Sequence, residues 1–305
     1  MTAPLPPPTS SAPFALALLS LDGVGRVSAH RVLERFPTLD ALRATPREQV
    51  LLRLKGVPNA DQTVAALFDD GAFRPALDRA EAQVADLRAK GIGVLAPGGA
   101  DGEPSPWPAA LDALPRADRP VVLYTYGDAG ALLRPALAVL ARAPVGGGAF
   151  ETAQALVRRA GGAAGLVVGA QSGVDLALQK VALAEGADVV VVVEAGLARL
   201  QPSMRAGATT AVRGGGVLVS SFPMTHGPFA HDDRERALVQ AALGRAVAVV
   251  GPPADSPEDR AAAWAAGAGR PVALVGAAPP DASWAEAAVP VDGPAAVEAV
   301  AGWLA

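Results

Sequence analysis

Three short apolar runs are the feature that most constrains how this chain can fold. They cover residues 164–169, 188–193 and 216–220 and consist largely of valine. Each has the length of a strand and lacks polar alternation, which is typical of strands buried on both faces of a parallel sheet. Helical segments separate the runs. This order predicts an open α/β sheet whose ligand sites lie in the loops at the carboxyl edge of the strands.

The same alternation extends through most of the chain. Further strands are expected at 121–126, 136–141, 246–251, 271–275 and 287–291, and helices at 149–160, 174–186, 232–243, 257–267 and 293–304. These elements predict an extended Rossmann-like, doubly wound sheet over residues 121–305. A small helical domain of the helix-hairpin-helix or SAM-like type is expected over residues 14–96. A linker rich in Pro and Gly should follow at 97–120, and residues 1–13 should form a disordered tail.

Composition excludes several classes of function. The 305 residues contain no cysteine and three histidines, so disulfides, thiolate chemistry and a three-histidine metal site are not expected. We expect neither a metal nor another cofactor. No apolar run reaches the length of a membrane span, and no signal peptide is recognisable, so a cytoplasmic protein is expected. The net charge of -4 does not indicate a nucleic-acid binder, although a local basic pocket is compatible with it.

The helical domain contains one glycine-rich hairpin. Gly23 and Gly25 in the segment 21–25 allow a sharp turn that presents backbone amides outward, with Arg26 beside them. Such amides can hold a phosphate without reading base sequence. The hairpin could equally do no more than join two packed helices. Residues 54–57 repeat the pattern less closely.

The α/β domain offers three candidate phosphate loops. Gly146, Gly147 and Gly148 follow an expected strand and precede a helix, which suits close approach of a phosphate to the backbone. They match neither the G-x-G-x-x-G fingerprint nor a Walker loop, and they can also be read as a flexible loop. Ser172 and Gly173 open a helix in the same way, and Asp175 there is either a ligand-binding acid or a first-turn acid favoured by the helix dipole. Arg234 and Arg236 in a polar segment could bind phosphates, or pair with the acids beside them.

These pieces, taken in order, resemble the DprA/Smf family of DNA-processing proteins over nearly the whole chain. The resembling segments are Trp107-Pro108-Ala109-Ala110-Leu111, residues 119–128, residues 186–191, Gly196-Leu197 with Gln201-Pro202, residues 219–223 and Arg234-Glu235-Arg236. The resemblance implies a helical module followed by a Rossmann-like domain, usually dimeric. It also implies sequence-independent binding of single-stranded DNA and loading of the RecA recombinase, notably in natural transformation, without catalysis.

The resemblance also assigns candidate residues. Arg142 falls on the arginine of the family's Gly-Ser-Arg motif, and Gly148 falls on a glycine that follows it. Gly169 and Gly173 fall on glycines of a second motif. Arg234 and Arg236 fall on the two arginines of the Arg-Asn-Arg motif. Gly-Ser is replaced by Leu140-Ala141, residues 256–261 add acids, and the winged helix often found after the sheet domain in this family is not expected here. Two alternatives stay open: a nucleotide or small-ligand enzyme or sensor on the same fold, and a degenerate scaffold that binds only protein.

Overall fold

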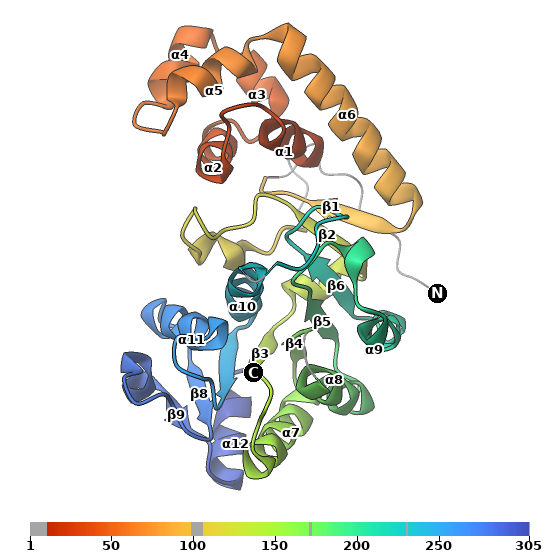
Figure 1. The fold of residues 1–305 in the computed structure, drawn as a ribbon, viewed down its shortest axis with the longest axis vertical. Coiled ribbons are helices and arrows are strands. Elements are labelled where there is room, and N and C mark those ends of the chain that lie inside the picture. The colour runs from red at the N-terminus through yellow and green to blue at the C-terminus, as the bar shows by residue number, and fades with distance from the viewer. Residues whose placement is uncertain (1–10, 99–105, 171–172, 230, 305) are drawn as a thin grey trace. The chain divides into compact units, whose positions relative to one another are not determined.

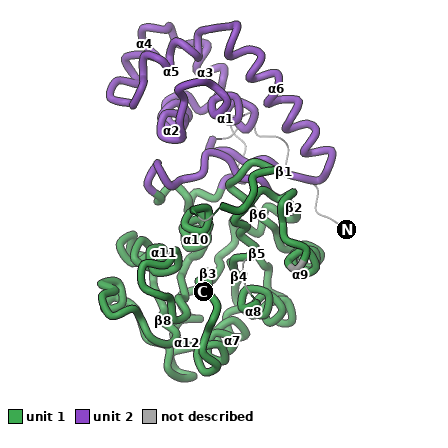
Figure 2. The backbone as a smooth tube through the Cα atoms, viewed as in Figure 1, with its two compact units in different colours: residues 1–4, 108–114, 126–305 green, residues 5–107, 115–125 purple. Residues whose placement is uncertain are grey.

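The computed structural model describes residues 11–98, 106–170, 173–229 and 231–304. The described chain divides into two compact units, which Figure 2 colours separately. A mainly helical unit contains residues 11–107 and 115–125, and an α/β unit contains residues 108–114 and those from 126 onward. Strand β2 (Leu123–Gly127) contains the boundary between them.

The helical unit is built from short helices and one long one. Its elements are α1 (Ser11–Leu19), α2 (Arg26–Arg35), α3 (Leu39–Arg43), α4 (Arg47–Arg53), α5 (Ala60–Leu67), α6 (Asp70–Ala89) and strand β1 (Ile92–Leu95). Local chemistry fixes several of the ends. Thr38 accepts a hydrogen bond from the amide of Ala41 at the start of α3, and Asp69 accepts one from Gly71 at the start of α6. The four-residue strand β1 was not expected from the sequence.

Helix α1 begins at Ser11, so residues 11–13 of the segment expected to be a disordered tail are helical instead. Ser11 and Phe14 are fully buried. The Phe14 ring meets Phe73 of α6 edge to face, with centroids 6.3 Å apart, and the Ser11 hydroxyl donates to the Gly98 carbonyl at 2.9 Å. These long-range contacts order a segment whose composition alone suggests a coil. The rest of that expected tail lies outside the described residues.

The α/β unit has parallel strands between two helical layers (Figure 1). Its strands after β2 are β3 (Ala136–Ala141), β4 (Gly165–Gly169), β5 (Val189–Val192), β6 (Val217–Ser220), β7 (Ala246–Val250), β8 (Val272–Val275) and β9 (Val289–Pro290). They lie in the order β6-β5-β4-β3-β7-β8-β9, and each neighbouring pair is parallel. The predicted doubly wound sheet is confirmed, although β9 is only two residues long.

Helices cover both faces of the sheet, and nearly every strand residue is therefore buried. The helices are α7 (Gly147–Gly161), α8 (Gly173–Ala184), α9 (Pro202–Arg213), α10 (Asp232–Leu243), α11 (Pro257–Gly267) and α12 (Pro294–Gly302), with short 3-10 turns at Ala109–Ala113, Ala129–Leu133, Leu197–Arg199 and Ser283–Ala287. Helices α7, α8, α9 and α12 share one core with alternate strand residues such as Val139 and Val168, whereas α10 and α11 pack together over strands β3 and β7.

Helix α9 was not expected, because Gly207, Thr209 and Thr210 weaken its helical signal. Tertiary packing supports it instead. Met204, Ala208 and Ala211 are buried in the core. A side chain at Gly207 would place its Cβ 2.3 Å from Leu176, so the glycine makes room for the neighbouring helix α8. No described helix is long and apolar enough to cross a membrane.

Candidate functional site

The carboxyl edge of the sheet has a switch point between β3 and β7. The chain runs from β3 through α7 to β4 on one side, and it returns from β6 through α10 to β7 on the other side. Loops leave two adjacent parallel strands in opposite directions there, and open α/β sheets bind their ligands in the crevice this creates. Arg142 directly follows β3, and Glu258 lies in the first turn of α11 after β7.

A charged cluster lies at this switch point. Arg142 Nε donates to Glu258 Oε2 at 2.7 Å, and Arg142 Nη2 donates to Asp233 Oδ2 at 2.7 Å. Arg236 Nη2 donates to Glu258 Oε1 at 2.5 Å, and Arg236 Nε donates to Asp233 Oδ1 at 3.3 Å. Two guanidiniums and two carboxylates therefore balance in charge. Glu258 is fully buried, and a charge in such a place is retained only when it is paired.

Arg236 is buried beneath Arg142. Only 1% of it is exposed, and its Nη1 donates to Gln240 Oε1 at 2.5 Å. Gln240 Nε2 in turn donates to the Val139 carbonyl at 2.6 Å, which ties helix α10 to strand β3. The structure thus brings Arg142 and Arg236 together as the sequence suggested, but it places carboxylates between them and holds Arg236 inside. Phosphate could reach Arg142, whose side chain is 29% exposed, before it reached Arg236.

Gly169 at the end of β4 is also buried. A Cβ atom there would lie 2.8 Å from Arg236 Nη1 and 2.7 Å from Asp175 Oδ2. Asp175 is in the first turn of α8 and only 1% exposed. The glycine predicted to admit phosphate therefore makes room for two buried side chains of the protein. Ser172 lies outside the described residues.

Electrostatics keep the outer guanidinium charged. Partial burial opposes the charge on Arg142, but the hydrogen bonds that it donates to Glu258 and Asp233 outweigh this effect and raise its pKa. The nearby Glu194, which follows β5, behaves in the opposite way. Burial, together with Asp233 and Asp232, raises its pKa despite the attraction of Arg236. The crevice is consequently rich in acids, and most of its positive charge is already engaged.

The first turn of α7 is the open part of this edge. Gly146 is its N-cap at φ −62°, ψ 147°, and no side chain caps the helix there. Gly146, Gly147 and Gly148 are all exposed, and a Cβ atom on any of them would meet nothing within 4 Å. Gly173 opens the adjacent helix α8 in the same exposed manner. Helix N-termini of this kind present backbone amides and a partial positive charge to solvent.

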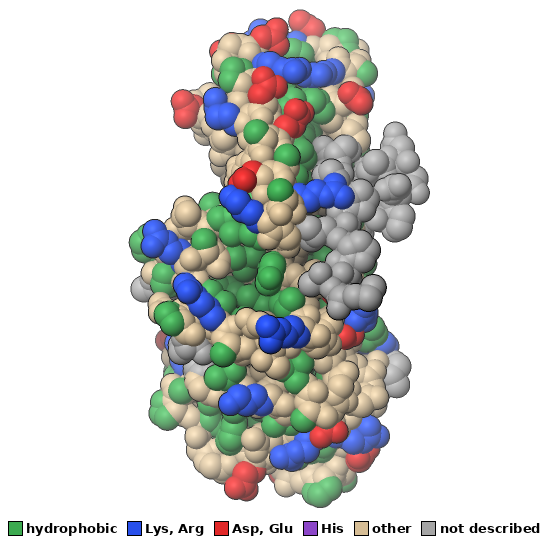
Figure 3. All heavy atoms as spheres, turned by 90° about the vertical axis from the view of Figure 1, so that its right-hand side faces the viewer, with side chains coloured by type: hydrophobic (Ala, Val, Ile, Leu, Met, Phe, Trp, Pro, Cys, Tyr) green, Lys and Arg blue, Asp and Glu red, His purple; other side chains and the backbone are tan. Residues whose placement is uncertain are grey.

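Arg234 is exposed on the first turn of α10, beside the acids Asp232, Asp233 and Glu235. It therefore stands outside the buried cluster and contributes positive charge to the rim. On the face drawn in Figure 3, the described lysine and arginine side chains are scattered among apolar, neutral and acidic ones. That face shows no continuous basic patch among the described residues. Nor do the described His, Asp and Glu side chains anywhere form a group of three suited to a metal ion.

The roles of Glu258 and Gln240 in the charged cluster were not predicted from the sequence. In the sequence Glu258 is one of several acids at residues 256–261, and the helical position of Gln240 carries no distinguishing signal. The strongest available clue is the Ser256-Pro257-Glu258 start of α11, where Ser256 accepts a hydrogen bond from Asp259 N at 3.1 Å. That cap predicts where the helix begins, and so puts Glu258 at the carboxyl edge.

The helical unit contains two turns of the same construction. In each, an amide donates to the carbonyl three residues earlier, and a glycine at positive φ occupies the third position. The turns are Leu21–Val24, with Gly23 at φ +79°, and Leu54–Val57, with Gly56 at φ +83°. A Cβ on Gly23 would lie 2.4 Å from the Gln62 side chain, whereas Gly25 and Gly56 face open space. Arg26 Nη1 donates to the Ala117 carbonyl at 3.3 Å.

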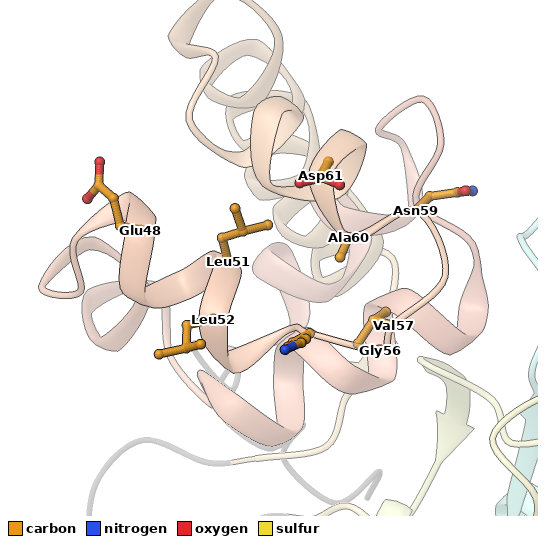
Figure 4. A pocket seen from close by; sticks show the side chains of 9 residues that line it. Glu48, Leu51, Leu52, Gly56, Val57, Asn59, Ala60 and Asp61 are labelled. Carbon is orange, nitrogen blue, oxygen red and sulfur yellow. The ribbon is translucent and has the colours of Figure 1, made fainter.

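A groove of about 520 Å³ lies beside the second turn (Figure 4). Leu51 and Leu52 of α4 form part of its wall, and Leu52 is 71% exposed. Glu48, Lys55 and Asp61 are charged lining residues. The second hairpin, whose sequence repeats the pattern of the first less closely, therefore borders a groove at the surface of this unit.

Comparison with known proteins identifies the relatives. A sequence model described as DNA recombination-mediator protein A matches residues 102–291, more than half of the chain. The X-ray structure of DNA processing protein A from Streptococcus pneumoniae aligns over 94% of this chain and 95% of that chain, with TM-score 0.67 and 18% identity. The same protein from Helicobacter pylori, described for its single-stranded DNA binding mode, aligns over 64% and 91%, with TM-score 0.54 and 19% identity.

These identities show a shared fold. A search of curated protein sequences finds no significant match. The family match includes the end of β3, the first turns of α7 and α10, and the start of α11, which surround the charged cluster. The resemblance first seen in short motifs is therefore confirmed, and this chain belongs to the DNA recombination-mediator protein A family.

Proposed function

We propose that this protein binds single-stranded DNA without base-sequence preference and without catalysis, through the carboxyl edge of its α/β unit. The observation that carries the proposal is the glycine-lined first turn of α7, which no side chain caps and which follows Arg142 after a short loop. Its amides and the outer guanidinium suit phosphate oxygens, which every nucleotide supplies. Membership in a recombination-mediator family and the DNA-binding relative from Helicobacter pylori support the same reading.

The candidate residues divide into two roles. Arg142, Arg234 and the amides of Gly146, Gly147 and Gly148 would contact phosphate, with Gly173 at the start of α8 extending the surface. Ser172 remains a candidate on the sequence alone. Arg236 and Gly169 would act from below, because their burial keeps them from solvent. Arg236 instead holds Glu258 and Asp233, the two carboxylates that orient Arg142.

The helical unit would assist. Its first hairpin, with Gly23, Gly25 and Arg26, would add a weaker backbone contact, since Gln62 lies against Gly23 and leaves Gly25 as its more open position. We also propose the properties implied by the family resemblance: a cytoplasmic homodimer that loads the RecA recombinase on single-stranded DNA in DNA uptake and recombination.

The test is a salt titration of oligothymidine binding followed by fluorescence anisotropy. Arg142→Ala should weaken binding by about 1 to 2 kcal/mol, or five- to thirtyfold, and should reduce the slope of log K against log salt by about 0.7. Arg159→Ala is the matched control. Arg159 lies in the last turn of α7, at the end of the helix away from the proposed site, and has an ion pair of the same length, Nε to Glu298 Oε1 at 2.7 Å. Equal binding by both folded variants would overturn the assignment of Arg142.

A protein-binding scaffold is the second candidate, and the exposed Leu52 beside the groove of the helical unit favours it. A nucleotide enzyme on this fold would place its ligand in the switch-point crevice, where this chain has its buried ion pairs. Absence of any oligonucleotide binding by the wild-type protein at low salt would favour the scaffold over the DNA-binding function. Hydrolysis in a nucleotide screen would instead support the enzyme.

A further inference from the structure

The loop between β6 and α10 gathers aromatic rings in a chain that has few of them. Phenylalanine, tryptophan and tyrosine make up only 4% of the sequence. Phe222 and His226 are stacked, with centroids 4.8 Å apart and planes 8° from parallel. Phe229 meets His226 edge to face at 5.0 Å, and Phe229 and His231 are stacked at 5.9 Å and 3°. Four rings thus form a continuous series from the core to the surface.

The outer two rings are accessible. Phe229 is 55% exposed and the His231 side chain is 82% exposed, whereas Phe222 is 6% exposed and buried at the base of the loop. Covering an exposed aromatic ring with another flat apolar surface removes the ring from water and lowers the free energy. The two outer rings are nearly parallel, so they offer flat faces in a common orientation.

The rings are held in place by one buried carboxylate. Asp232 is 1% exposed. Its Oδ2 accepts from the Phe229 amide at 2.8 Å and lies 2.9 Å from His226 Nε2, and its Oδ1 lies 3.3 Å from His231 Nε2. Asp232 therefore holds Phe229 and His226 through hydrogen bonds and lies close to the His231 ring. This preorganisation reduces the entropy lost when a ligand covers the rings.

The base of the loop is fixed as well. The Ser220 hydroxyl donates to the Ala195 carbonyl at 2.7 Å, and the Gly196 amide donates to the His226 carbonyl at 2.9 Å. A Cβ atom on Gly196 would lie 2.1 Å from the Pro223 carbonyl oxygen, so only glycine allows this approach. The loops after β5 and β6 are thereby joined, and the rings stand on a rigid support.

The rings adjoin the proposed phosphate surface. His231 immediately precedes α10, and Asp233, two residues later, binds Arg142 at 2.7 Å. Arg234 is exposed on the same first turn. Surfaces that bind single strands without sequence preference combine cationic groups for the backbone with aromatic faces for the bases. Here both kinds of group meet at the beginning of one helix.

We infer that Phe229 and His231 form a stacking platform for unpaired bases of the DNA strand whose phosphates bind near Arg142. This inference rests on the single-stranded DNA binding proposed above and assigns the part of the surface that contacts bases. Every base has a flat face, so the platform adds affinity without adding sequence preference. It also accounts for aromatic rings at a protein surface that is otherwise poor in them.

The test compares Phe229→Leu with Tyr126→Leu in the full chain. Leucine keeps the apolar character at position 229 but removes the ring. Tyr126 is 44% exposed. Its neighbour Gly127 lies against Gly216 at the start of β6, so Tyr126 is near the amino edge of the parallel strands and not near the carboxyl edge where DNA is proposed to bind. Each variant is titrated with oligothymidine and with an abasic oligomer of the same length. Phe229→Leu should weaken oligothymidine binding about five- to one-hundredfold with an unchanged salt slope, and Tyr126→Leu should not.

The abasic oligomer separates stacking from phosphate binding. Wild type should bind it more weakly than oligothymidine. Phe229→Leu should discriminate less between the two oligomers, because only the His231 ring remains, and Phe229→Trp should restore discrimination. If wild type binds both oligomers equally, or if Phe229→Leu binds oligothymidine as wild type does, the stacking platform is refuted and phosphate binding stands. If wild type binds neither oligomer, the proposed DNA-binding function fails and the platform fails with it.

Discussion

Removing Arg236 should destabilise the fold far more than removing an arginine at the surface. Arg236→Met leaves the fully buried Glu258 with only Arg142 as partner, and it leaves two carboxylates facing one guanidinium. It also deprives Gln240 Oε1 of its donor. Breaking a buried pair costs about 3 to 5 kcal/mol, and because Arg142 still pairs with both acids, we expect a loss near the lower limit, about 3 kcal/mol.

The double variant tests whether charge balance is the cause. Glu258→Met alone leaves two guanidiniums facing Asp233 and should cost a similar amount. Arg236→Met combined with Glu258→Met leaves Arg142 paired with Asp233 at 2.7 Å, one charge of each sign. The double variant should therefore be more stable than the sum of the two single losses by about 2 to 3 kcal/mol.

Urea unfolding with linear extrapolation measures these free energies. Arg159→Met provides the surface control. Its guanidinium pairs with Glu298, but their side chains are 49% and 58% exposed, so the loss should stay below about 1 kcal/mol. Losses at positions 236 and 258 that add within about 0.5 kcal/mol, or a loss for Arg236→Met no larger than the control, would refute the coupled buried cluster.

Two further predictions concern the α7 terminus and a buried histidine. Gly146→Asp and Gly146→Asn should each raise the free energy of unfolding by a few tenths of a kcal/mol, because both residues act as N-caps. Only the aspartate should weaken oligothymidine binding, about fourfold or more for a charge ~5 Å from phosphate. Equal Kd values for the two variants would remove the amide turn from the interface. Burial lowers the pKa of His30, despite its contact with the Arg119 carbonyl at 3.0 Å. The folded state thus binds fewer protons than the unfolded state, so the contribution of His30 to stability is full above about pH 6.5. Below that pH the free energy of unfolding falls by up to ~1.4 kcal/mol per pH unit. His30→Gln should flatten this decline when urea midpoints are measured against pH, and an unchanged slope would contradict the role of His30.

Local signals in the sequence were sufficient for the framework. Valine-rich runs buried on both faces predicted the strands of a parallel sheet, and the positions of α10 and α11 were predicted to the residue. The same signals failed at α9, where packing of Met204 and Ala208 overrides weak helical propensity, and at residues 11–13, where burial of Phe14 orders a segment of coil-like composition. Periodicity describes an element by itself, whereas these two depend on what each element packs against.

The sequence by itself determined which residues stand at the carboxyl edge, because the order of strands and helices brings the ends of β3, β6 and β7 to one side of a parallel sheet. Only the tertiary structure decided which of them face solvent. The polar segment at residues 232–236 looks uniformly solvated as a sequence, yet Asp232 and Arg236 are buried and Arg234 is exposed. The reason is that Arg236 finds Glu258 across the packing of two helices, and ion pairing between distant segments leaves no mark on the local pattern.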